Sequence, residues 1–340
     1  MNRIANSGRG RLNVRSLAAL GLAAIGLAVA GCGGAGSPAV NAPASSAHTA
    51  VEQAAVMNWL AKTNSMLTAN NFAGLDQITT GQMRTLYLSE ERQASLPKNA
   101  DREGFQLTGL SITIPCHTGS PAVFVAYADT DVFDFGAGPQ SVAMVFERVG
   151  GLWKLATAVN HSDGGWPALC TQGAAPAAPA RLAPDSYISD LARVLTGAAS
   201  GAAQTARTAS PFAVNDFLAG SGSIPATSAT SIRQDRRAGV SYASGFAPAG
   251  DPTFALPLAD GRGYWVIGAL IQRNSYSAPA GLRASTWPDG NQVATPRPAV
   301  VHHETDTFVT TYTAIDPPYS ASAAVALDGF FGWPLATVAS

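Results

Sequence analysis

The spacing of apolar residues changes from a helical to a strand period in the first part of the folded region. From Thr49 to Leu67, apolar side chains recur every three or four positions, and Thr49 with Glu52 matches an N-terminal capping box. We predict an amphipathic helix there and a second, weaker helix over 72–95. Beyond it, alternating apolar residues predict four strands, at 105–114, 123–127, 142–148 and 153–159. The Gly-Gly pair at 150–151 predicts a tight hairpin turn between the last two strands.

The second part of the chain repeats this order more loosely. A helical stripe comes first, followed by a Gly-, Ser- and Ala-rich region over 197–231; the stripe consists of Tyr187, Ile188, Leu191, Val194 and Leu195. β-Branched and aromatic residues then predict strands at 264–271, 300–312, 323–327 and 335–338. This order favours a degenerate copy of the first module. An unrelated α+β domain is the alternative.

These patterns predict an α+β fold of two tandem modules. In each module, N-terminal helices would pack on a curved, cone-like antiparallel sheet, as helices commonly cover one face of such a sheet. The folded region is too long for one ordinary core. We place the first domain at 48–172, an Ala/Pro-rich linker at 173–184 and the second domain at 185–340.

The first 47 residues follow a different pattern, which indicates export. Four Arg residues precede an uncharged apolar run from Leu17 to Ala30, which is shorter than the roughly 20 residues of a membrane-spanning helix. The run ends in Val29-Ala30-Gly31-Cys32, which resembles the lipobox of bacterial lipoproteins. This resemblance implies a signal peptide over 1–31 and acyl chains, such as palmitate, on Cys32. An ordinary secretory signal followed by a chance cysteine is the alternative.

Residues 32–47 are predicted to form a tether. The charge balance of the chain limits the classes of partner that we expect. The tether is rich in Gly, Ala, Ser and Pro, so it cannot bury enough surface to fold. Four of the 21 Lys and Arg residues and none of the 22 Asp and Glu residues lie in 1–31, so the mature chain carries a net charge of −5. An acidic chain without a basic run is not typical of a nucleic-acid binder. We expect a lipid-anchored protein on the extracytoplasmic side of the cell membrane.

The two remaining cysteines, Cys116 and Cys170, predict a disulfide bond, because an even pair in an oxidising compartment is usually oxidised. The alternative is a metal site or a catalytic thiol, because His117 adjoins Cys116 and His161 lies nine residues before Cys170. The spacing lacks the close pairs typical of zinc sites.

Two resemblances extend this interpretation. The hairpin sequence over 144–156 resembles the last two strands of the nuclear-transport-factor-2-like and SnoaL-like superfamily, which implies a cone-shaped cavity in the first domain. The lipobox and tether, with the segments 259–265 and 314–319, resemble an uncharacterised family of actinobacterial lipoproteins carrying a domain of unknown function. That resemblance implies location and architecture. It supplies no catalytic residue, and no cofactor is expected.

The candidate chemistry is sparse. His302, Glu304 and Asp306 would share one face of a strand and are weak candidates for a metal site, with a solvated strand or loop as the alternative. We expect a non-catalytic module that binds an envelope protein, a small apolar molecule or a cell-wall ligand. The alternative is a SnoaL-like cyclase or isomerase acting on a small apolar substrate in the first-domain cone. Its acid/base candidates are Asp129, Asp131 and His117.

Aromatic residues give two further hypotheses. Trp59, Phe124, Tyr127 and Trp153 either line an apolar ligand cavity or belong to the core, which their spacing favours. Trp166 and Trp287 each precede a proline in a loop and are expected at the surface, where they would suit a partner interface.

Overall fold

The computed structural model describes most of the chain from residue 46 onward. The described residues are 46–69, 71–94, 104, 106–116, 122–130, 140–161, 165–171, 183–199, 211–213, 237, 239–283, 300–318 and 323–339. The expected signal peptide, Cys32 and most of the linker lie outside them, as do His117, Asp131 and Trp287. Within the described part, no helix is long and apolar enough to cross a membrane.

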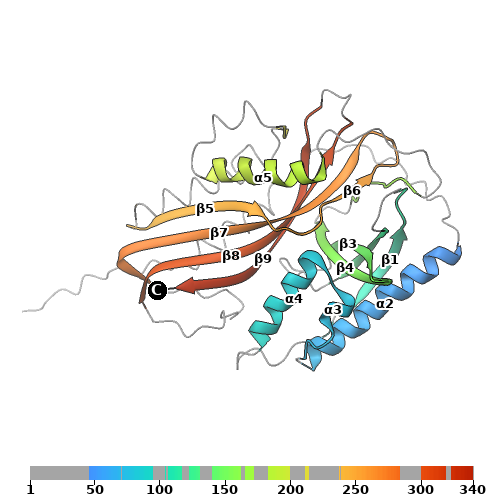
Figure 1. Ribbon diagram of the computed structural model, residues 1–340, viewed down its shortest axis with the longest axis horizontal. Helices are drawn as coiled ribbons and strands as arrows, with labels where there is room; N and C mark the ends of the chain where they lie inside the picture. The colour runs from blue at the N-terminus through green and yellow to red at the C-terminus, as the bar shows by residue number, and fades with distance from the viewer. Residues whose placement is uncertain are drawn as a thin grey trace, which may run out of the picture.

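In the described part of the first half there are three helices and a four-stranded sheet (Figure 1). The helices are α2 (Ser46–Thr68), α3 (Leu75–Ile78) and α4 (Gly81–Ala94). The strands are β1 (Leu107–Thr113), β2 (Val123–Thr130), β3 (Gln140–Val149) and β4 (Leu152–His161). The sheet is antiparallel in the order β1-β2-β3-β4, so each strand pairs with the next along the chain.

In the described part of the second half, one long helix is followed by strands, the longest of which exceed those of the first half. Helix α5 (Pro184–Ala199) precedes the strands, which are β5 (Ser241–Pro248), β6 (Phe254–Pro257), β7 (Tyr264–Arg283), β8 (Val300–Asp316) and β9 (Ala326–Ala339). They form an antiparallel sheet in the order β5-β7-β8-β9, and β6 also pairs with β7. Figure 1 shows the long strands running side by side, with α5 lying above β5.

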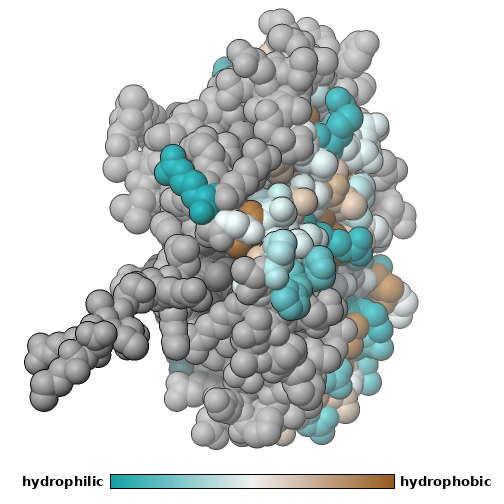
Figure 2. Space-filling view, turned by 90° about the vertical axis from the view of Figure 1, so that its left-hand side faces the viewer, coloured by the Kyte–Doolittle hydropathy of each residue, from teal (hydrophilic) through white to brown (hydrophobic). Residues whose placement is uncertain are grey.

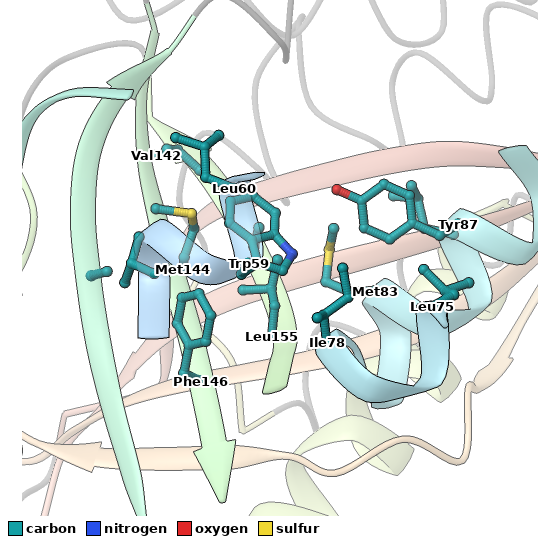
Figure 3. Close-up of a cluster of buried hydrophobic side chains, with 14 of the residues drawn as sticks. Trp59, Leu60, Leu75, Ile78, Met83, Tyr87, Val142, Met144, Phe146 and Leu155 are labelled. Atoms are coloured by element: carbon teal, nitrogen blue, oxygen red, sulfur yellow. The ribbon is translucent and has the colours of Figure 1, made fainter. Parts of the chain in front are cut away.

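The strands of the first sheet bury apolar side chains on both faces. On β3, Val142, Met144 and Phe146 belong to a cluster shared with α2, α3 and α4, which Figure 3 shows. The intervening residues, Ala143 and Val145, belong to a second cluster with residues of β6 and β7 in the other sheet. The layers are therefore stacked in the order helices α2 to α4, first sheet, second sheet. A third cluster joins the outer face of the second sheet to α5.

This arrangement corrects the expected fold class. The expected pair of separate, cone-like α+β modules built on N-terminal helices is wrong. The described residues are 52% strand and 28% helix, in two sheets with few and mostly short helices. The physical reason is that β2 and β3 are apolar on both faces, so the first sheet must bury its second face against the other sheet.

Individual elements agree better with the patterns than the fold class does. The helices predicted over 49–67 and around 187–195 are confirmed as α2 and α5, and the four strands of the first half are confirmed. The sequence patterns missed β5 and β6. Segment 335–338 and the last two residues of segment 323–327, expected as two strands, lie within the single long strand β9.

A short segment and a disulfide link the two sheets. The Cys116 amide donates to the Cys170 carbonyl over 2.8 Å, and the Cys170 amide donates to the Pro257 carbonyl over 2.8 Å. Residues 168–171 thus pair with the end of the first sheet on one side and with β6 on the other. Cys116 and Cys170 form the expected disulfide, with their Cα atoms 5.3 Å apart, so neither thiol is free for metal binding or catalysis.

Candidate binding site

The predicted residues of strand β8 lie along one face of the second sheet. Glu304 is 4% exposed and Asp306 is 1% exposed, whereas His302 is exposed. Across the strand pair, Glu304 lies opposite Tyr276 and Asp306 lies opposite Asn274. Directly opposed residues of antiparallel strands project from the same face, so the two acidic residues share their surface with polar side chains of β7.

Four neighbouring side chains on β5 and β7 form a hydrogen-bonded group on this face. Tyr242 Oη donates to Asn274 Oδ1 over 3.1 Å, and Gln272 Nε2 donates to the same oxygen over 3.0 Å. Gln272 Nε2 also lies 3.4 Å from Ser244 Oγ. The rings of Tyr242 and Tyr276 are 5.1 Å apart. We define the polar array as Tyr242, Ser244, Gln272, Asn274, Tyr276, Glu304 and Asp306.

The fold positions the polar array beside helix α5. On β7, Val266 and Leu270 lie on the same face as Gln272 and Asn274, and both pack with α5. Near the end of that helix, Thr196 Oγ1 accepts a hydrogen bond of 2.9 Å from the Phe246 amide on edge strand β5. Phe246 pairs with Gln272. The polar array therefore begins on this face of the sheet at the point where the apolar contact with α5 ends.

This group of side chains is suited to hydrogen bonding with a polar ligand. Its half-buried amide and hydroxyl groups both donate and accept, and its two tyrosine rings offer flat apolar surfaces. Tyr242, Ser244, Gln272 and Tyr276 are half-buried, which leaves them accessible to a ligand. Figure 2 views the molecule from the left-hand side of Figure 1. There, the described hydrophobic residues lie scattered among hydrophilic ones, without a broad apolar patch.

The metal hypothesis gains no support from the geometry. Within the described part of the chain, no three His, Cys, Asp or Glu side chains come together as metal ligands. His302 Nδ1 instead lies 3.3 Å from the Ala278 carbonyl oxygen.

Of the three acid/base candidates, one lies in the described part of the chain. Asp129 is exposed on β2, and Asp131 and His117 lie outside the described residues. Burial raises the pKa of two other carboxyl groups, Glu147 and Asp251, which the sequence analysis did not identify. For Glu147, a hydrogen bond from Thr80 and the charge of Lys154 oppose this increase in pKa. Single acidic residues carry no recognisable motif, so only the tertiary structure reveals their burial.

Three of the four aromatic residues proposed to line a cavity, Trp59, Phe124 and Trp153, belong to one packed cluster with Phe146. Phe124 stacks on Phe146 at 4.8 Å, and the edge-to-face contacts of Trp153 with Phe124 and of Trp59 with Phe146 span 4.8 and 6.0 Å. These distances are typical of packed aromatic cores. Figure 3 shows Trp59 and Phe146 among the aliphatic side chains of the same cluster.

Trp166, expected at the surface, is partly buried between the two sheets. Its ring lies 5.8 Å from that of Tyr127 and 5.7 Å from that of Trp265, and its Nε1 donates to Ser141 Oγ over 2.8 Å. Burial raises the pKa of Tyr127 well above its ordinary value. Trp166 therefore helps to join the sheets.

Comparison with known proteins assigns no family to this arrangement. No family model matches the sequence, and no curated protein or solved structure is significantly similar to the chain. The resemblances to the nuclear-transport-factor-2-like superfamily and to actinobacterial lipoproteins stay predictions from the residues. The lipobox-like motif and the polar array are therefore the features of the chain that bear on its function.

Proposed function

We propose that this chain is a non-catalytic lipoprotein of the cell envelope, anchored through Cys32, that binds a hydroxyl-rich cell-wall ligand on its second sheet. The N-terminal order of Arg residues, apolar run and Val29-Ala30-Gly31-Cys32 supports the anchor. The disulfide between Cys116 and Cys170 is consistent with export, because such bonds persist in oxidising compartments.

The polar array is the observation that carries the binding proposal. Two donors converge on the single oxygen Asn274 Oδ1, which holds Tyr242 and Gln272 in fixed positions. Side chains held in this way lose little conformational entropy when a ligand binds. Sugar rings present hydroxyl groups at their edges and C–H groups on their faces. The amides of the polar array can form hydrogen bonds with the hydroxyl groups, and the rings of Tyr242 and Tyr276 can pack against the C–H faces.

The geometry gives less support to an acid/base enzyme in the first half. A cyclase or isomerase of the SnoaL-like kind needs a carboxyl or imidazole group facing an apolar substrate cavity. Asp129 is exposed, and three of the four aromatic side chains proposed for the cavity wall, Trp59, Phe124 and Trp153, pack between the helices and the sheet.

Isothermal titration of the purified protein with muramidase-released cell-wall fragments tests the binding proposal. The variant Q272A removes a donor from the polar array, and we expect roughly tenfold weaker binding from the loss of its hydrogen bonds. Ser275 is a matched control, because it lies on the same strand and its exposed hydroxyl is 3.3 Å from Thr305 Oγ1, away from the polar array. S275A should bind as the parent protein does.

Equal affinity of Q272A and the parent protein, or no binding by the parent, would contradict the glycan proposal. Native mass spectrometry of protein purified from its own membranes gives an independent measurement. If a protein and no glycan is found bound, the glycan proposal is overturned and the ligand is a protein partner.

A further inference from the structure

Helix α2 exposes apolar side chains on the face that points away from the first hydrophobic cluster. Its inner face contributes Val56, Trp59 and Leu60 to the first hydrophobic cluster. On the outer face, Val51 is 58% exposed and Met57 is 50% exposed. Three exposed alanines, at positions 50, 54 and 61, extend this surface. We define the outer face of α2 as Ala50, Val51, Ala54, Met57 and Ala61.

The charges of α2 also distinguish this face. The helix has a single acidic residue, Glu52, and its side chain is 6% exposed, on the packed side. Lys62 is exposed and follows directly after Ala61. The exposed surface of the helix therefore combines these apolar groups and one positive charge with uncharged polar side chains, which include Gln53 and Asn58. This combination suits the interface of a membrane that contains anionic lipids.

The position of α2 in the chain places it close to the proposed lipid anchor. Only 13 residues separate Cys32 from Ser46, where the helix begins. For a Gly-, Ala- and Ser-rich composition of that length, chain statistics give a root-mean-square span of about 20 Å. A lipid on Cys32 would therefore keep the start of α2 near the headgroups, so that even a weakly apolar face meets the membrane at a high effective concentration.

We propose that the outer face of α2 lies on the membrane that anchors the protein, and thereby orients the two sheets relative to it. This inference rests on the proposed lipidation of Cys32. The outer face is too small to hold the protein without the acyl chains, because a few apolar side chains give only weak, reversible membrane binding. The anchor supplies the attachment, and α2 supplies the orientation.

The layered fold determines which surface of the protein would then face away from the membrane. Helix α2 packs on one face of the first sheet, and the second sheet packs on the other. Figure 1 shows α2 at the lower margin of the molecule and α5 at the upper margin. A protein resting on α2 directs α5 and the outer face of the second sheet, which includes the polar array, away from the bilayer. That direction suits a ligand in the cell wall.

Site-specific fluorescence on the full lipidated protein tests the inference. The variant M57C places an environment-sensitive dye on the outer face of α2, and S186C places the same dye at an exposed position of α5 as a matched control. The probe membrane is a vesicle of phosphatidylethanolamine and phosphatidylglycerol. After flotation with the vesicles, we expect iodide to quench the dye at position 57 roughly twofold less than the dye at position 186. Adding V51E and A54E to the M57C variant should abolish that protection.

The outcomes separate the orientation from the anchor. Protein that floats with the vesicles, yet has equally quenched dyes at positions 57 and 186, overturns the orientation and leaves the anchor intact. Lipidation-competent protein that fails to float overturns both. A C32A variant that floats as well as the parent protein overturns the anchor, because retention would then not depend on the acyl chains.

Discussion

Asp251 illustrates how a single side chain links the two halves of the molecule. It follows β5 and lines a small pocket together with Gln82 of α4 and Thr157 of β4. Burial raises the pKa of its carboxyl group above the ordinary value of 3.8. A raised folded-state pKa means that the protonated form is favoured in the folded protein. The stability contribution is therefore largest at low pH, and is lost as the pH rises from about 4 through the folded-state pKa.

We expect D251N to raise the melting temperature at neutral pH, because it removes a charge that is only partly solvated. The difference from the parent protein should shrink as the pH falls below about 4, where the parent carboxyl group is also neutral. Thermal unfolding followed by circular dichroism across pH 3–8 measures this, with the exposed D129N as the control. A D251N variant less stable than the parent at neutral pH would contradict the prediction.

The packing of α5 on β7 depends on a glycine. A Cβ atom added to Gly268 would lie 2.4 Å from Ile188 Cγ1 and 2.6 Å from Ile188 Cδ1. Ile188 belongs to the cluster that joins α5 to the second sheet. The absence of a side chain at position 268 therefore sets how closely this helix approaches its strand.

We expect G268A to lower the free energy of unfolding by about 1–3 kcal/mol through overpacking against α5. Gly245 on β5 is the matched control, because an added Cβ there meets nothing within 4 Å. Urea unfolding of both variants measures the difference. Shortening the opposing side chain in G268A/I188A should recover part of the loss. Equal stability of G268A and G245A would show that α5 can shift without cost.

At the scale of the whole molecule, the disulfide and residues 168–171 join the two sheets at one edge. Cys170 lies between Cys116 on one side and Pro257 on the other, so the covalent bond reinforces a ladder that spans both sheets. Close to it in sequence, Trp166 packs against Tyr127 of one sheet and Trp265 of the other. Loosening this edge should therefore disturb both sheets together.

Reduction should lower the melting temperature of the protein. The sequence separation of 54 residues corresponds to about 4 kcal/mol of stabilisation in the chain-entropy model, as an upper value. Differential scanning calorimetry with and without reductant measures the change, and we expect tryptophan fluorescence to change in the same transition. Two alkylatable thiols in the native protein would contradict the disulfide itself.

The sequence by itself determined most of the local elements, though not β5 and β6, and the cysteine pairing. The helical spacing of Val56, Trp59 and Leu60 identified the packed face of α2, because a helix on a core buries a stripe of period 3.6. The period of two in β2 to β4 similarly identified the first sheet. Two cysteines remaining after the proposed anchor made one pairing available, and the structure contains it.

Only the tertiary structure decided how the sheets meet and which polar residues come together. Strand periodicity shows that a residue faces one side or the other, yet it does not say whether a helix, a sheet or a ligand covers that side. Apolar residues on both faces of β3 are compatible with several partners until the second sheet is in place. Tyr242, Gln272 and Asn274 became neighbours through strand register, which depends on long-range pairing absent from any local pattern.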